Sequence, residues 1–121
     1  MPSQLRRRYF KTSPIMVRPS MNAYAAAKAG LEGLVRSIAV ELAPSGITVN
    51  ALAPGYFLTD GNSAVRRENP AFESWIAGRT PAGRWGQPEE LVGAAVFLSS
   101  PASDFVNGQI IYVDGGLLAA M

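Results

Sequence analysis

Tyr24 and Lys28 are the two side chains of this sequence whose types and spacing suit proton transfer. They are four residues apart, so on a helix both project from the same face on neighbouring turns. A phenol with a pKa of about 10 is a poor acid or base at neutral pH, and a fixed ammonium at about 5 Å favours its phenolate by roughly 3 kcal/mol. The pair can therefore act as a general acid/base toward a carbonyl oxygen, although an amphipathic surface helix with a snorkelling lysine has the same spacing.

A helix and a strand must position this pair. Apolar residues recur every three or four positions and predict a helix from Asn22 to Ala43, which the Pro44-Ser45-Gly46 sequence ends. The run 47–53 begins with β-branched residues and predicts a buried strand, closed by Pro54-Gly55. A helix followed directly by such a strand indicates an α/β fold.

After this strand, the sequence predicts a long loop or lid, another helix and a second strand. The segment from Tyr56 to Gln87 contains several proline breakers and one short predicted helix around 71–76, and an insertion of this length is typical of a functional loop or lid. Pro88 suits the first position of another helix. A second strand is predicted at 109–113, followed by Asp114-Gly115-Gly116.

Composition excludes several function classes. The chain has 121 residues, which suffices for one domain at most, and 48% of them are hydrophobic, which suits a packed core. It contains no cysteine and no histidine, so disulfides, Cys/His zinc sites, thiol nucleophiles and Ser-His-Asp triads are excluded. A net charge of +2 argues against nucleic acid as a partner, and no apolar run is long enough to span a membrane. We predict no metal site.

The amino terminus is strongly basic. Residues 1–31 contain no acidic side chain, and 1–17 is predicted to be a basic, disordered leader. The same composition fits a mitochondrial transit peptide, or a leader created by a displaced start site or reading frame, and an RNA-binding arm is a weaker alternative because few aromatic residues accompany the charges. We expect a cytoplasmic protein, with a mitochondrial location as the alternative.

Four motifs follow one another along the chain from about Arg18 to Gly116. In order, they are Tyr24-Ala-Ala-Ala-Lys28-Ala-Gly30, Asn50-Ala-Leu-Ala-Pro54-Gly55-Tyr-Phe-Leu-Thr59, Arg84-Trp-Gly-Gln-Pro-Glu-Glu90 and Val113-Asp-Gly-Gly116. With these motifs the sequence resembles the short-chain dehydrogenase/reductase family, and it is most similar to the gluconate 5-dehydrogenase and 3-oxoacyl-carrier-protein reductase branch. The resemblance implies an oxidoreductase that transfers hydride between NAD(H) or NADP(H) and an alcohol/carbonyl pair of a small-molecule substrate.

The resemblance also implies roles for individual residues. Tyr24 would be the catalytic acid/base, and Lys28 would lower its pKa and bind the nicotinamide ribose. Pro54-Gly55 would line the nicotinamide site and Thr59 would bind the carboxamide, whereas without the resemblance these are an ordinary strand-ending turn and a loop hydroxyl. The stretch 56–84 would be the substrate lid, although its large apolar residues suit plain packing equally well. These apolar residues are Phe57, Phe72, Trp75 and Ile76.

The expected fold is therefore α/β: the C-terminal portion of a Rossmann-like doubly wound parallel sheet, in which 18–121 is a partial domain. The N-terminal nucleotide-binding half is expected to be missing, because no G-x-G-x-x-G loop occurs. The family's catalytic serine position falls on Lys11, and Ser13 is a possible substitute. The long helix is expected to bury one face on the sheet and the other on a sister subunit, which predicts a homo-oligomer. The alternative function is a non-catalytic remnant that serves as an oligomerisation or binding module.

Overall fold

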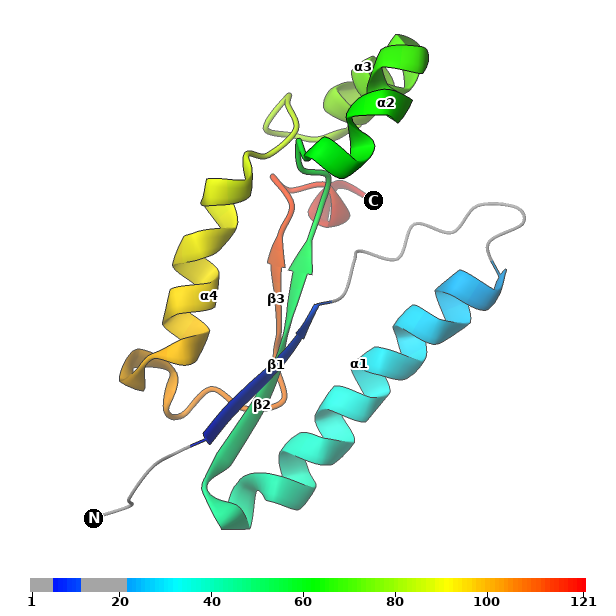
Figure 1. Cartoon of the computed structure of the whole chain (residues 1–121). Coiled ribbons are helices and arrows are strands. Elements are labelled where there is room, and N and C mark those ends of the chain that lie inside the picture. Colours follow the sequence, from blue (N-terminus) through cyan, green and yellow to red (C-terminus); the bar gives the residue numbers. More distant parts are fainter. Residues whose placement is uncertain (1–5, 12–21) are drawn as a thin grey trace.

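A three-stranded parallel sheet forms the centre of the molecule. The structure is a computed structural model, and it describes residues 6–11 and 22–121, with residues 6–11 and Tyr24 described by their backbone. The strands lie in the order β1 (Arg6–Lys11), β2 (Ile47–Pro54) and β3 (Ile110–Val113). Helices α1 (Asn22–Leu42) and α4 (Val92–Ser99) lie on opposite sides of the sheet (Figure 1). This arrangement is the predicted α/β fold.

Helix α1 and strand β2 together form the main buried cluster of the described residues. It ends at Leu42 in a short 3-10 turn (Ala43–Ser45) and then at Gly46, whose φ of 71° is a left-handed conformation that favours glycine. The predicted helix and its stop signal are thus confirmed. One apolar face of the helix packs on β2, and the buried cluster consists of Val35, Ala39, Val49 and Ala51.

Strand β2 is buried from Thr48 to Pro54, as expected for the central strand of a parallel sheet. Its Asn50 side chain is 2% exposed and bonds the chain before β3, donating to the Val106 carbonyl at 2.9 Å and accepting from the Gln109 amide at 3.0 Å. The predicted strands at 47–53 and 109–113 are confirmed as β2 and β3, with small shifts at their ends.

The structure differs from the prediction for the basic leader. Residues 6–11, which lie within the predicted disordered segment 1–17, form β1 and pair in parallel with residues 47–52 of β2. Tyr9 and Phe10 favour strand conformation, and pairing gives the open edge of β2 its hydrogen-bond partners. The rest of that segment, with Ser13, lies outside the described residues.

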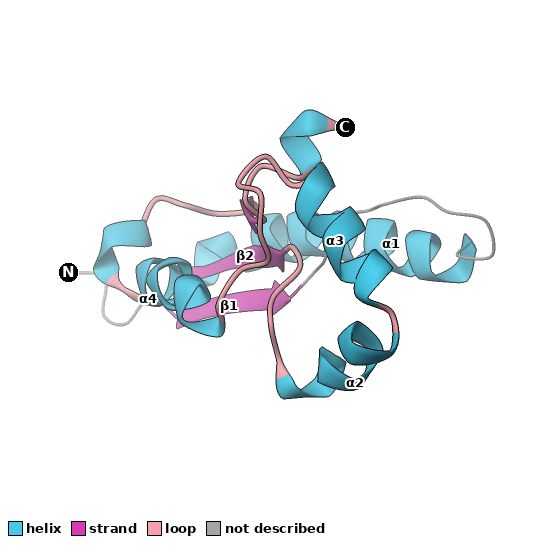
Figure 2. Ribbon diagram, turned by 90° about the horizontal axis from the view of Figure 1, so that it is seen from above, coloured by secondary structure: helices cyan, strands magenta, loops and turns pink. Residues whose placement is uncertain are grey.

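The predicted lid is more helical than its breakers suggest. It contains α2 (Asp60–Glu68) and α3 (Pro70–Arg79), of which only α3 was predicted, as a shorter helix. Both helices lie beyond the carboxyl ends of the strands (Figures 1 and 2). The helix predicted to begin at Pro88 starts as a 3-10 turn (Pro88–Leu91) and continues as α4. Within the described residues, no helix combines the length and the apolarity needed to cross a bilayer.

Candidate cofactor and substrate site

The candidate site lies at the carboxyl edge of the sheet, where parallel α/β folds bind their ligands. Strands β2 and β3 end side by side there, and the Gly55 amide donates to the Val113 carbonyl at 2.9 Å. Helix α1 runs antiparallel to β2, so its first turns point toward this same edge (Figure 1). Residues from β2, β3, α1 and the lid thus share one end of the molecule.

Gly55 is required at this edge by the neighbouring strand. A Cβ atom built on Gly55 would lie 2.7 Å from the Asp114 Cβ and 2.8 Å from the Asp114 Cα, distances that real Cβ atoms do not reach. The Asp114 side chain is itself fixed, because its carboxylate accepts the amides of Gly116 at 2.9 Å and Leu118 at 3.0 Å. The absence of a side chain at Gly55 therefore lets β2 and the turn after β3 meet.

A pocket of about 230 Å³ opens beside this contact. It contains three of the five predicted site residues, namely Pro54, Gly55 and Thr59. Its other lining residues are Tyr56, Phe57, Asn62, Pro88 and Leu91. None of these eight side chains is charged, and the hydroxyl and amide groups of Thr59 and Asn62 provide polar contacts. The lining suits an uncharged, mostly apolar group.

The two remaining predicted residues lie near the start of α1. Tyr24 is in its first turn and Lys28 follows one turn later, so the helical spacing on which the proton-transfer hypothesis depends is present. The Tyr24 side chain lies outside the described part of the chain. Lys28 is half-buried and is not among the residues that line the described pockets.

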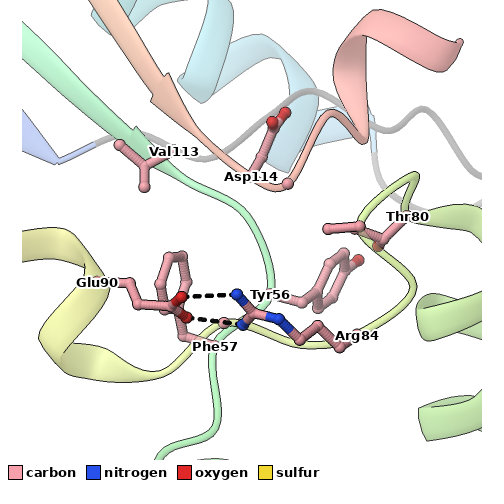
Figure 3. Close-up of a pocket in the computed structure, with 10 residues that line it drawn as sticks. Tyr56, Phe57, Thr80, Arg84, Glu90, Val113 and Asp114 are labelled. Carbon is pink, nitrogen blue, oxygen red and sulfur yellow. Dashed lines mark hydrogen bonds and ion pairs between the residues drawn. The ribbon is translucent and has the colours of Figure 1, made fainter.

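A second, smaller pocket of about 110 Å³ lies between the lid and the end of β3. Figure 3 shows its labelled side chains: Arg84 and Glu90 face each other on one side, with Asp114 and Val113 across from them. Tyr56 and Phe57 line both pockets. The sequence indicated Arg84 and Glu90 as part of a motif but assigned neither a role.

Arg84 and Glu90 form a bidentate ion pair, with nitrogen to oxygen distances of 2.8 and 2.7 Å. Glu90 also accepts the Gln87 backbone amide at 2.7 Å. The hydrogen bonds from Arg84 and from this amide lower the pKa of Glu90 from 4.5 to about 2, and the pairing raises the pKa of Arg84. The carboxylate therefore closes the loop 84–90 and stays charged at any physiological pH.

Most apolar side chains of the lid pack within the protein. Ile76 and Phe57 are buried, and the Trp85 indole donates to the Glu73 carbonyl at 3.0 Å. The Tyr56 ring meets the Trp85 ring edge to face at 5.3 Å between centroids. Trp75, by contrast, is 44% exposed. The packing interpretation thus holds for Phe57 and Ile76, while Phe57 also lines the pockets.

The chain is similar in sequence to known oxidoreductases. Residues 11–118 match the family model described as Enoyl-(Acyl carrier protein) reductase. The 5-keto-D-gluconate 5-reductase of Escherichia coli (strain K12) is 54% identical over 104 residues, which are 86% of this chain and 41% of that protein. The chain therefore spans about two fifths of the length of this relative.

Solved structures are similar over nearly the whole chain. A gluconate 5-dehydrogenase from Burkholderia cenocepacia J2315, in complex with NADP and tartrate, has a TM-score of 0.87 at 47% identity, covering 95% of this chain and 46% of its own. An oxidoreductase of the short chain dehydrogenase/reductase family from Burkholderia thailandensis has a TM-score of 0.83 at 33% identity, covering 93% of this chain and 45% of its own. These matches confirm the fold class: the chain is part of a Rossmann-like doubly wound sheet.

Proposed function

Because the chain belongs to the short-chain dehydrogenase/reductase family, we propose that it serves hydride transfer between an alcohol/carbonyl pair and NAD(H) or NADP(H). The observation that carries this proposal is the uncharged pocket of about 230 Å³ at the carboxyl edge of the sheet, which brings together Pro54, Gly55 and Thr59. Three of the family motifs meet there, since Pro88 of the third motif also lines the pocket and Gly55 contacts Asp114 of the last motif.

The lining of this pocket fits a nicotinamide ring. Its apolar walls suit a flat ring, and we assign the Thr59 hydroxyl to binding the carboxamide. We assign Pro54, Gly55 and Thr59 to holding this part of the cofactor, and Lys28 to binding its ribose. When bound, the cofactor supplies or accepts the hydride.

The proton chemistry is assigned to α1. In reduction, the Tyr24 hydroxyl donates its proton to the carbonyl oxygen, and in oxidation the Tyr24 phenolate accepts the proton of the alcohol. Lys28, one turn away, is assigned to stabilising the negative charge of the phenolate. Both residues lie in the first two turns of α1, and this end of the helix is the one nearest the carboxyl edge (Figure 1).

We assign the substrate to the sugar acids and their keto derivatives. The support is the 54% identity to a 5-keto-D-gluconate 5-reductase and the 47% identity to a gluconate 5-dehydrogenase. The lid helix α2, which contributes Asn62 to the pocket, and helix α3 would enclose such a substrate.

Cofactor binding tests the proposal directly. We would measure the free energy of unfolding in urea with NADH or NADPH, and with ADP as a control without a nicotinamide. A cofactor present at 100 times its dissociation constant should raise this free energy by about 2.7 kcal/mol. The increase should be smaller for Thr59→Val. The absence of any increase with either cofactor would contradict the proposal.

A non-catalytic oligomerisation module is the second candidate, and exposed apolar side chains favour it. Val40 on α1 is 77% exposed, and Leu34 on the same helix and Val96 on α4 are exposed as well. A second copy of the chain would cover such surfaces. Under this candidate, Val40→Glu would convert an oligomer to a monomer in analytical ultracentrifugation, and NAD(P)H would leave stability unchanged.

A further inference from the structure

The Asn62 side chain holds the backbone on which Thr59 lies. Its Oδ1 accepts the Thr59 amide at 3.2 Å, and its Nδ2 donates to the Phe57 carbonyl at 2.7 Å. The two bonds engage both ends of the amide and fix the chain on either side of Leu58. Asn62 also lines the same pocket as Thr59.

Arg66, one turn further along α2, fixes the orientation of Asn62. Its Nε donates to the Asn62 Oδ1 at 2.9 Å, and a terminal nitrogen lies 3.5 Å from the Thr59 carbonyl oxygen. Because a guanidinium can only donate, the oxygen of the Asn62 amide must face it, which leaves the nitrogen for the Phe57 carbonyl.

The same guanidinium also contacts α3 and Trp85. Arg66 lies 3.7 Å from the Glu73 carboxylate on α3, and its Cζ lies 5.8 Å from the centre of the Trp85 ring. Trp85 in turn donates to the Glu73 carbonyl. Thr59, α3 and the 84–86 segment are therefore joined through one arginine whose side chain is 19% exposed.

We propose that Asn62 is a positioning residue for the cofactor contact of Thr59, and that Arg66 couples this contact to α3 and Trp85. The inference rests on the proposed function, because it assigns Thr59 to the nicotinamide. Its structural basis is independent of that assignment: the Thr59 amide depends on Asn62, and Asn62 depends on Arg66.

Amide hydrogen exchange, followed by NMR on the full chain, tests the structural part. Asn62→Ala should speed exchange of the Thr59 amide by about tenfold, the ratio that corresponds to one lost hydrogen bond. Arg66→Gln should produce a smaller increase at the same amide. Arg67→Gln changes an exposed arginine of the same helix and should leave Thr59 unchanged. Asn62→Asp keeps the acceptor oxygen and should restore the protection of Thr59.

Titration with reduced nicotinamide mononucleotide tests the functional part, because this probe contains only the half of the cofactor that the pocket would hold. In the wild-type chain, the amide signals of Gly55 and Thr59 should shift. Asn62→Ala should weaken the affinity by about tenfold, Asn62→Asp by less, and Arg67→Gln not at all.

The outcomes separate the two proposals. Wild-type binding with unaltered affinity in Asn62→Ala and Arg66→Gln overturns the positioning role and leaves the proposed function intact. No binding by the wild-type chain overturns the proposed function and the positioning role together, even where exchange shows that Asn62 protects Thr59. Arg66→Gln retains Asn62, so it provides a second measurement if Asn62→Ala unfolds α2.

Discussion

Gly55 and Asp114 touch so closely that a Cβ on Gly55 would lie 2.7 Å from the Asp114 Cβ. The atoms that it would meet belong to a side chain held by two backbone amides and to the backbone itself, so they cannot move away freely. Gly55→Ala should therefore lower the free energy of unfolding by about 1–3 kcal/mol, the usual cost of overpacking. Urea denaturation measures this change.

The matched control for this substitution is Gly78→Ala in α3. No atom lies within 4 Å of a Cβ built on Gly78, and alanine is favoured over glycine in helices by about 0.5–1 kcal/mol. We expect this variant to be slightly more stable than the wild type. If Gly55→Ala and Gly78→Ala changed the free energy of unfolding equally, the close contact between Gly55 and Asp114 would be contradicted.

The low pKa of Glu90 predicts a pH dependence of stability. Its pKa is lowered in the folded state, so the stabilisation is complete above the ordinary value of 4.5 and is lost as the pH falls toward about 2. Glu90→Gln should be less stable than the wild type at pH 7. The difference should shrink between pH 4.5 and 2, because the wild type alone loses the Arg84 ion pair there.

Unfolding midpoints measured from pH 2 to 7 check this expectation. Glu89→Gln, at the exposed neighbouring position, is the control for removing one negative charge. If the unfolding midpoints of Glu90→Gln and the wild type differ by the same amount at every pH in this range, the Arg84–Glu90 pair does not cause the pH dependence of stability.

The two tryptophans should respond differently to substitution by phenylalanine. Trp85→Phe removes the indole donor of the Glu73 carbonyl, and leaving a partly buried acceptor unpaired costs about 1–3 kcal/mol. Trp75 is exposed, and Trp75→Phe should change stability by about 0.5 kcal/mol or less. Calorimetry of both variants measures the change in stability. Similar losses of stability in the two variants would mean that the hydrogen bond from Trp85 to the Glu73 carbonyl contributes little.

Under the proposed function, Tyr24→Phe should strongly lower the rate of NAD(P)H-dependent reduction of 5-keto-D-gluconate, because the ring remains but the proton donor is lost. A decrease of at least about 10² is expected, the lower range of general acid/base contributions. Tyr112→Phe removes a different hydroxyl, one that donates to Glu32 at 3.2 Å, and should retain activity. Turnover by the Tyr24→Phe variant at the wild-type rate would exclude Tyr24 as the acid/base.

Elements with a strong local pattern were predictable from the sequence. Helix α1 has apolar residues at helical spacing and a Pro-Ser-Gly stop, and β2 is a short β-branched run closed by Pro54-Gly55. Pro54, Gly55 and Thr59 were indicated by the family resemblance rather than by this local pattern, and one pocket contains all three.

Features that depend on distant contacts were not predictable. Helix α2 has one large apolar side chain, Val65, so its sequence resembles a polar loop. The residues of β1 are mostly basic, and their pairing with β2 joins segments far apart along the chain. The reason for Gly55 lies in Asp114, whereas the sequence indicated an ordinary strand-ending turn or, through the family resemblance, a residue that lines the nicotinamide site. The Asn62–Arg66 pair has ordinary helical spacing, and only the folded chain shows which backbone it holds.

The register of the sheet gives its two ends different mechanical support. Strand β1 pairs with residues 47–52 of β2 and β3 with residues 51–54, so within the described strands only Ala51 and Leu52 have neighbours on both sides. Beyond Leu52, the part of β2 that leads into the pocket pairs, among the described strands, with β3 alone. A mutation or a docking partner that separates β3 from β2 would therefore loosen the end of β2 that lines the pocket before it disrupts the rest of the sheet.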